Sequence, residues 1–244
     1  MLVAALIIGM AKSGFAGGIG ILAVPITANV LPADVALGVL LPVLIAADIV
    51  ASATHFKNVA WKQLRPMLLG SVPGIVLASV LLLWLGDIGG LARMLNLVVG
   101  SLCLVLVGLQ AWRLAGRPLP RVPSNASTAG GVGGLCGLIS TLTHAAGPIA
   151  SIYLLELRFD KAKLVATAAW FFLLLNVAKV PTYAGLGLIN PGTLKQSLWM
   201  ASAVPLGAWL GIVLHKRIPE KPFQFIIYVA AAAASARMLY LGLT

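Results

Sequence analysis

The apolar residues of the chain fall into eight long segments separated by short polar stretches. The segments cover residues 1–30, 34–53, 67–85, 91–112, 127–157, 164–180, 195–214 and 222–243. A helix needs about 20 apolar residues to cross the roughly 30 Å hydrocarbon layer of a bilayer. The segments are continuous and rich in Leu, Ala and Val, without the alternation typical of a membrane barrel. The pattern therefore predicts an all-α integral membrane protein.

Two segments differ from the others because small residues and proline interrupt them. The first contains KSGFAGGIGILAVP at 12–25, and the fifth contains GLISTLTHAAGP at 137–148. Glycine lowers helix stability and proline lacks the backbone donor, so neither segment is expected to form one straight helix. Each arm of the fifth segment has only about 13 to 15 residues, roughly 20 Å of helix. We predict two half-helices that meet near the middle of the membrane, and a similar hairpin over 1–30.

The basic residues favour a hairpin over a full crossing at 127–157. Four polar stretches carry three basic residues each: Lys57, Lys62 and Arg65; Arg113, Arg117 and Arg121; Arg158, Lys161 and Lys163; and Lys216, Arg217 and Lys221. Eight full crossings would leave two stretches on each side, against the usual excess of Lys and Arg in cytoplasmic loops. A fifth segment that enters and returns on the same side brings all four stretches to the cytoplasm.

The two halves then share one plan in opposite orientations. The first repeat, 1–121, has the hairpin 1–30 and crossings 34–53, 67–85 and 91–112, and the second, 122–244, has the hairpin 127–157 and crossings 164–180, 195–214 and 222–243. Weak similarity supports this: Val24-Pro25 pairs with Gly147-Pro148, Asp48 falls opposite Asn176, and SVPGIVLA at 71–78 pairs with AVPLGAWL at 203–210. Inverted repeats with broken helices are a plan of secondary transporters.

Composition agrees with a membrane location and excludes several other classes of protein. Hydrophobic residues make up 60% of the chain and charged residues 9%, whereas about a quarter of a soluble domain is charged. The net charge of +11 lies in short stretches between helices, so we expect no nucleic-acid partner. Cys103 and Cys136 stand alone in apolar segments, which argues against a metal site. The usual nucleotide-binding and hydrolase motifs do not occur, so we expect no enzymatic activity and no cofactor.

Polar residues at the first break are candidates for anion binding. Lys12 lies at this break, and a lysine deep in a membrane segment is costly unless it reaches the interface, pairs or meets an anion. The amides from Ser13 to Gly18, including Gly17, are candidates for an anion-binding helix N-terminus. Lys179 is a second candidate. Because it lies near the predicted outer end of its helix, snorkelling to the interface is an equal alternative for Lys179.

The second break contains His144, with Thr143 before it and Gly147 and Pro148 after it. A histidine that titrates near neutrality can donate to an anion or carry a coupling proton, although a lone histidine often only packs. Thr143 offers a hydroxyl, although such hydroxyls commonly bond to their own helix. Asp48 is the only acid well inside a crossing segment, and it is either the counter-ion of Lys12 or a protonatable site for coupling.

Three stretches of the chain resemble the sulfite exporter TauE/SafE family, also called the toluene-sulfonate uptake permease family. They are GMAKSGFAGGIGILAVP at 9–25, THAAGPIASIYLLELRFDKAKLVATAAWFFLLLNVAKVPTYAGLGLINPGTL at 143–194 and PLGAWLGIVLHKRIPEKPF at 205–223. The first is similar to the family's GF-x-KGGFGGG element but departs from it at Ser13 and Ala16. The resemblance implies a bacterial inner-membrane permease with substrate-site residues Lys12, Gly17, Gly18, His144, Gly147, Pro148 and Asn176.

The resemblance and the residue pattern together predict the function. We expect a secondary transporter of sulfur-containing or other organic anions, such as sulfite, sulfoacetate or sulfonates, that works by alternating access with proton coupling through His144 or Asp48. The alternatives are a passive anion channel and a membrane subunit without transport activity. The expected partners are a small anionic substrate and the lipid bilayer. The resemblance and small-residue faces such as Gly207 and Gly211 imply a homodimer, although such glycines pack helices within one chain as readily.

Overall fold

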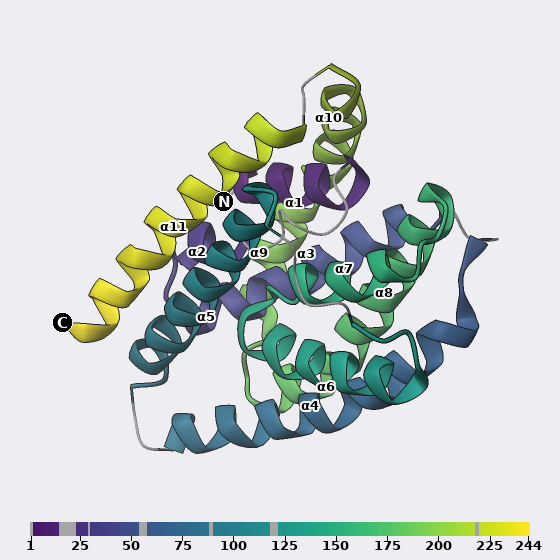
Figure 1. Cartoon of the computed structure of the whole chain (residues 1–244). Coiled ribbons are helices and arrows are strands. Elements are labelled where there is room, and N and C mark those ends of the chain that lie inside the picture. The colour runs from purple at the N-terminus through teal and green to yellow at the C-terminus, as the bar shows by residue number, and fades with distance from the viewer. Residues whose placement is uncertain are drawn as a thin grey trace.

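The computed structural model describes residues 2–14, 23–28, 30–53, 58–87, 90–117, 122–217 and 220–244. Every regular element within these ranges is an α-helix (Figure 1). The helices are α1 (Leu2–Gly14), α2 (Ala23–Ala28), α3 (Ala33–Ala53), α4 (Trp61–Asp87), α5 (Leu91–Leu114), α6 (Ala126–Thr143), α7 (Gly147–Glu156), α8 (Lys161–Gly185), α9 (Pro191–Ala201), α10 (Val204–Arg217) and α11 (Glu220–Leu243).

Four helices of the described part are long and apolar enough to span a membrane: Ala33–Ala53, Trp61–Leu85, Leu91–Leu114 and Ala162–Gly185. In α3, 67% of the most apolar stretch is buried inside the protein, against 33 to 39% in the other three helices. Helix α3 therefore lies in the interior of the bundle, where α8 and α9 pack against it. The chain is a multi-pass membrane protein, as the hydrophobic segments predicted.

The predicted break in the fifth segment is present, and the chain folds back there. Helix α6 ends at Thr143, α7 begins at Gly147, and both helices contact each other. The thiol of Cys136 lies 3.9 Å from the carbonyl oxygen of Ala146, whereas ten residues of straight helix would extend over about 15 Å. Asn125 begins α6 by accepting a hydrogen bond from the Thr128 amide through its side chain, 2.8 Å apart. Such a side-chain cap satisfies a free amide of the first turn.

The pairing of helices fixes their relative directions. Helices α4 and α8 run the same way, because the Ala60 amide donates to Thr167 at 3.0 Å and the hydroxyls of Ser79 and Thr182 lie 2.9 Å apart. Helix α6 runs alongside α4 in the same direction. Because α6 and α8 both begin at the end of the bundle where α4 begins, the intervening α7 must return to that end. This is the geometry of the hairpin predicted at 127–157.

Helices α5 and α11 pack side by side in opposite directions (Figure 1). The Arg93 side chain at the start of α5 donates to the carbonyl oxygen of Gly242 at 2.9 Å, near the end of α11. Further along, Gly100 lies against Ser235. The two helices predicted at 91–112 and 222–243 are therefore antiparallel neighbours.

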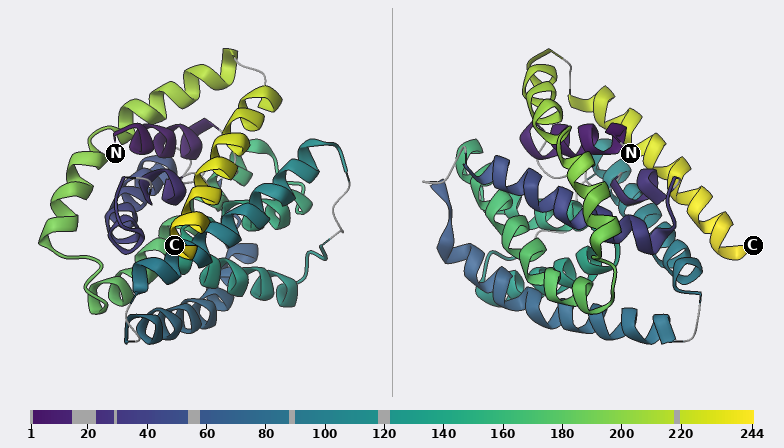
Figure 2. Two further views of the ribbon diagram at one scale, coloured as in Figure 1. Left: turned by 90° about the vertical axis from the view of Figure 1, so that its left-hand side faces the viewer. Right: turned by 180° about the vertical axis from the view of Figure 1, so that it is seen from behind.

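The seventh predicted segment, 195–214, is wrong as a single helix. The structure divides it into α9 and α10, which follow different directions on either side of Ser202 and Ala203 (Figure 2). Pro205 explains the break, because it lacks the amide that would bond to Ala201 and because proline disfavours helical geometry in the preceding residue. The division of the chain into repeats at 121 and 122 stays a prediction.

Glycines bring two pairs of helices into backbone contact. In the pair formed by α4 and α6, Gly70 lies against Gly130 and Gly74 against Gly134. In the pair formed by α1 and α10, Gly207 lies against Leu6 and Gly211 against Met10, so this GxxxG pair packs helices within the chain. Close approach of small residues is a common basis of helix packing in membranes, where there is no hydrophobic driving force between helices. The expected homodimer stays a prediction that Gly207 and Gly211 no longer support.

Candidate functional site

Helix α8 presents three polar side chains to the interior of the bundle. Asn176, Lys179 and Tyr183 are spaced three and four residues apart, which places them on one face of the helix. Asn176 is 2% exposed, and Lys179 and Tyr183 are completely buried. This face of α8 meets α3 and the break between α6 and α7, and the contacts define a buried polar site.

The ammonium group of Lys179 has three hydrogen-bond acceptors around it. The Nζ atom lies 3.1 Å from the carbonyl oxygen of Ser140, 2.9 Å from the Ser140 hydroxyl and 3.0 Å from Nδ1 of His144. A lysine ammonium has three donors and no acceptor, so the three contacts match its capacity. Among the described side chains, Lys179 is the only Lys or Arg that is buried. The snorkelling alternative for Lys179 is therefore wrong.

His144 occupies the break itself. Its backbone has φ 54°, in the left-handed region that residues other than glycine rarely adopt. Its amide donates to the Ser140 carbonyl at 2.9 Å, which ends α6. The Nε2 atom lies 3.1 Å from the carbonyl oxygen of Leu37 in α3, and the ring lies against Tyr183 with centroids 5.6 Å apart. The break thus holds the imidazole between α3 and α8.

Asp48 and Asn176 form the second half of the site. Asn176 Nδ2 donates to Asp48 Oδ2 at 2.7 Å, and the Asp48 side chain is completely buried in α3. Asn176 lies one turn of α8 before Lys179, so the carboxylate of Asp48 belongs to the same buried polar group. The interpretation of Asp48 as a counter-ion for Lys12 or as a proton site stays open, because the side chain of Lys12 lies outside the described residues.

The remaining residues of the second break have contacts that shape the backbone. The Thr143 hydroxyl donates to the Ile139 carbonyl at 2.8 Å and accepts from the Ala145 amide at 3.1 Å, which closes the end of α6. Gly147 and Pro148 are buried at the first two positions of α7, where proline is tolerated because these amides have no partner within the helix. The substrate-binding roles predicted for Thr143, Gly147 and Pro148 stay predictions.

The first break is described only in part. Lys12 and Ser13 lie in the last turn of α1, and their side chains are outside the described part of the structure. The prediction that the amides from Ser13 onward begin a helix is wrong for Ser13, because that residue is at the end of α1. Gly17 and Gly18 lie outside the described residues. Their predicted roles, and that of Lys12, are therefore still predictions.

Two residues of the site were not predicted from the sequence: Tyr183, and Ser140 as a hydrogen-bond acceptor for Lys179. The Tyr183 hydroxyl donates to the Thr141 carbonyl at 2.6 Å and lies 3.5 Å from Nε2 of His144. The signal that was available is spacing: Tyr183 follows Asn176 by seven residues, which is two turns of helix.

The arrangement can hold an anion or move a proton. It combines a buried ammonium, an imidazole and a carboxylate at a helix break within a membrane-spanning bundle. Ionisable groups inside the membrane are costly and are commonly part of substrate or proton pathways. The backbone at the break is tolerated because the protein encloses it. These features are typical of the central site of a membrane transporter.

The sulfite exporter TauE/SafE family model matches residues 1–238 of the chain. The chain belongs to this family, as the three quoted stretches predicted. No curated protein and no solved structure matches it. Membership implies a membrane transporter of the sulfite or anion exporter type, not an enzyme.

Proposed function

We propose that the protein is a secondary transporter of small sulfur-containing or organic anions, such as sulfite, sulfoacetate or sulfonates, in the bacterial inner membrane. The observation that carries the proposal is the buried Lys179 ammonium, which meets His144 at a helix break. A buried ammonium gains free energy from a nearby anion, and an anion oxygen is a stronger acceptor for it than a neutral imidazole nitrogen. Each charge-assisted hydrogen bond contributes about 1.5 to 3 kcal/mol.

The substrate site extends from Lys179 and His144 toward both breaks. The positive end of a helix dipole favours anions, and α7 begins three residues after His144. Asn176 offers an amide donor one turn away. Lys12, Ser13, Gly17 and Gly18 supply the contribution of the first hairpin.

Alternating access follows from an inverted repeat, which two features support. Asp48 and Asn176 are the positions predicted to be equivalent in the two halves, and they bond to each other at 2.7 Å. Equivalent residues that touch must lie close to the two-fold axis that relates the halves. In addition, α6 packs by glycine contacts on α4 of the other half, and α1 packs by glycine contacts on α10 of the other half. Rocking of one half against the other would expose the central site to each side in turn.

Transport against a gradient distinguishes this proposal from a passive channel. In proteoliposomes that contain the full chain, radiolabelled thiosulfate, which is fully ionised near neutrality, should accumulate above its external concentration when a pH gradient is imposed. A channel would only equilibrate the anion. If the parent protein neither binds nor moves any of sulfite, thiosulfate, sulfoacetate or p-toluenesulfonate, the reading as a membrane subunit without transport activity is favoured instead.

Replacement of Lys179 tests the site itself. Lys179→Met keeps the length of the side chain and removes its charge, so anion affinity should fall by about tenfold to a hundredfold, on the energy range of one charge-assisted bond. Lys195→Met is the matched control, since Lys195 is exposed on α9 and the same change there should leave affinity unaltered. Equal affinity in parent and Lys179→Met would place the anion elsewhere.

A further inference from the structure

The hydrogen bonds of His144 fix the position of its ring proton. The Nε2 atom faces the Leu37 carbonyl at 3.1 Å and the Tyr183 oxygen at 3.5 Å. Because Tyr183 donates its own hydrogen to Thr141, both atoms around Nε2 are acceptors. The proton of the neutral imidazole therefore lies on Nε2, and Nδ1 accepts from the Lys179 ammonium at 3.0 Å.

We propose that an anion replaces Nδ1 of His144 at the Lys179 ammonium, and that Nδ1 then binds one proton, so that anion and proton are taken up together. This inference rests on the proposed function and deepens it. Two donors of Lys179 are held by Ser140, through its carbonyl oxygen and its hydroxyl. The third donor is the one that His144 occupies. A charged oxygen is a stronger acceptor for it than a neutral imidazole nitrogen.

The proton is required by the chemistry of the two acceptors. An anion oxygen bound at Lys179 faces Nδ1, and two acceptors cannot share a contact unless a proton lies between them. Nε2 is already committed to Leu37, so the proton from water binds at Nδ1. The imidazolium then donates from Nδ1 to the anion and from Nε2 to Leu37. For a monoanion, one negative charge and one proton enter together, and the net charge of the buried group does not change. An unchanged net charge is important in an apolar interior, because an uncompensated charge there is costly.

Other titratable side chains lie near His144 and are alternative proton sites. They are Lys179 and Tyr183 on α8, Asp48 on α3 and Cys136 on α6. Asp48 is the acid of this group, and it is linked to α8 through Asn176. A test must therefore separate His144 from Asp48.

Proton uptake on anion binding is the direct measurement. Purified full-length protein in lightly buffered detergent solution at neutral pH is titrated with p-toluenesulfonate, thiosulfate and sulfoacetate, which are fully ionised there. The parent should take up about one proton for each anion bound, because Nδ1 gains a proton when the anion replaces it at Lys179. His144→Gln should bind the anion without a proton, because glutamine can accept from Lys179 and donate to Leu37 but does not titrate. His215→Gln is the matched control and should behave as the parent.

A second measurement does not depend on a variant. In protein labelled with ¹⁵N at histidine, NMR should show the His144 ring in the neutral Nε2–H form when no anion is bound. After anion binding, the same ring should be in the doubly protonated form. Anion binding without proton uptake overturns the inference and leaves the proposed function in place. If Asp48→Asn loses proton uptake and His144→Gln keeps it, the inference is likewise overturned and the proposed function stays in place. Failure of the parent to bind any of these three anions or sulfite overturns both.

Discussion

At the scale of single residues, Tyr183 should stabilise the break in the second hairpin. Its hydroxyl donates to the Thr141 carbonyl at 2.6 Å, and carbonyls in the last turn of a helix have no partner within that helix. Tyr183→Phe leaves this buried acceptor unsatisfied, which should lower the free energy of unfolding by about 1 to 3 kcal/mol. Thermal and denaturant unfolding in detergent measure the change. Tyr240→Phe, at an exposed position, should have little effect, and equal stability of both variants would contradict the role given to Tyr183.

The sequence predicted most of the polar site but left the environment of Lys179 undecided. Lys179 was expected near the outer end of a helix at 164–180, whereas α8 continues to Gly185, so the lysine lies well inside the helix and is buried. Hydropathy underestimates such an extension because Pro181 and Thr182 lower the local apolar signal, although the helix continues through them. Tyr183 was missed because an aromatic residue in an apolar segment is usually a packing residue, and its hydrogen bond depends on tertiary structure.

At the scale of helices, the contact between α4 and α6 depends on the absence of side chains at its glycines. A Cβ atom at Gly137 would collide with the backbone of Ser71 in α4. Gly137→Ala should therefore force the helices apart and destabilise the protein by about 1 to 3 kcal/mol, the usual cost of overpacking. Gly131→Ala on the same helix has open space around its Cβ position and should be neutral or slightly stabilising. Unfolding curves of the two variants compare them directly, and a neutral Gly137→Ala would show that α6 can move away from α4 at no cost.

Helix positions were predictable from the apolar segments, and helix ends were not. The apolar segments show which residues lie in the hydrocarbon layer, but a helix can continue beyond that layer. Helix α4 begins at Trp61, six residues before the predicted start at 67, because its first turns are polar and hydropathy does not detect them. The break at His144 was predictable because glycine, proline and polar residues coincide there. The break between α9 and α10 was missed because Pro205 is the only strong signal, and proline also occurs within α4 and α8 without dividing them.

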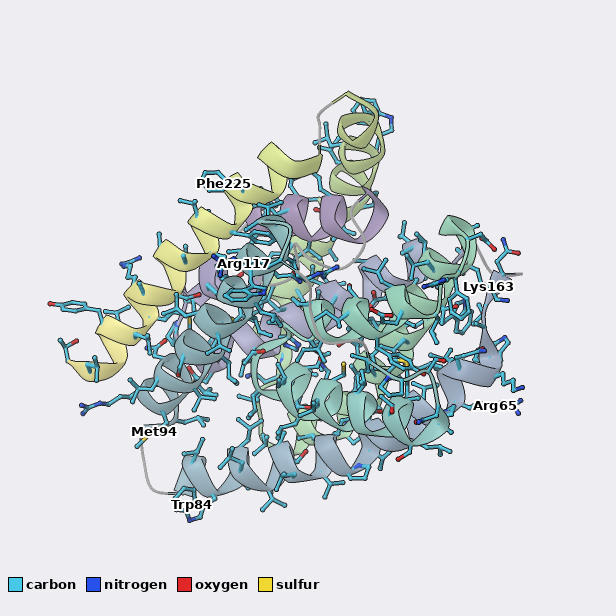
Figure 3. All side chains as sticks on the ribbon, in the orientation of Figure 1. Arg65, Trp84, Met94, Arg117, Lys163 and Phe225 are labelled. Carbon is cyan, nitrogen blue, oxygen red and sulfur yellow. The ribbon has the colours of Figure 1, made fainter. Side chains whose placement is uncertain are left out.

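At the scale of the whole molecule, the helix directions bring the described residues of the four basic stretches to one end. Helices α4 and α8 begin at that end, and α4 ends at the opposite end, where α5 begins. Helix α5 therefore finishes at the end where α4 begins, and so does the start of its antiparallel neighbour α11. Arg65 in α4 and Lys163 in α8 lie on one side of the view in Figure 3, and Trp84, near the end of α4, lies on the other. This arrangement supports the charge argument that led to the hairpin at 127–157, and it places the start of α9 at the opposite end.

Labelling of single cysteines tests this topology in the membrane. In a chain whose buried Cys103 and Cys136 are replaced by Ala, cysteine is placed singly at the exposed positions Lys62, Arg117, Asp160 and Gly192. Because cytoplasmic loops carry the excess of Lys and Arg, the first three cysteines should react with an impermeant reagent only from the cytoplasmic side. The cysteine at 192, at the start of α9, should react only from outside. Reaction of position 160 from outside, with 117 still cytoplasmic, would mean that residues 127–157 cross the membrane completely. The halves would then share one orientation, and the inverted repeat on which alternating access depends would be excluded.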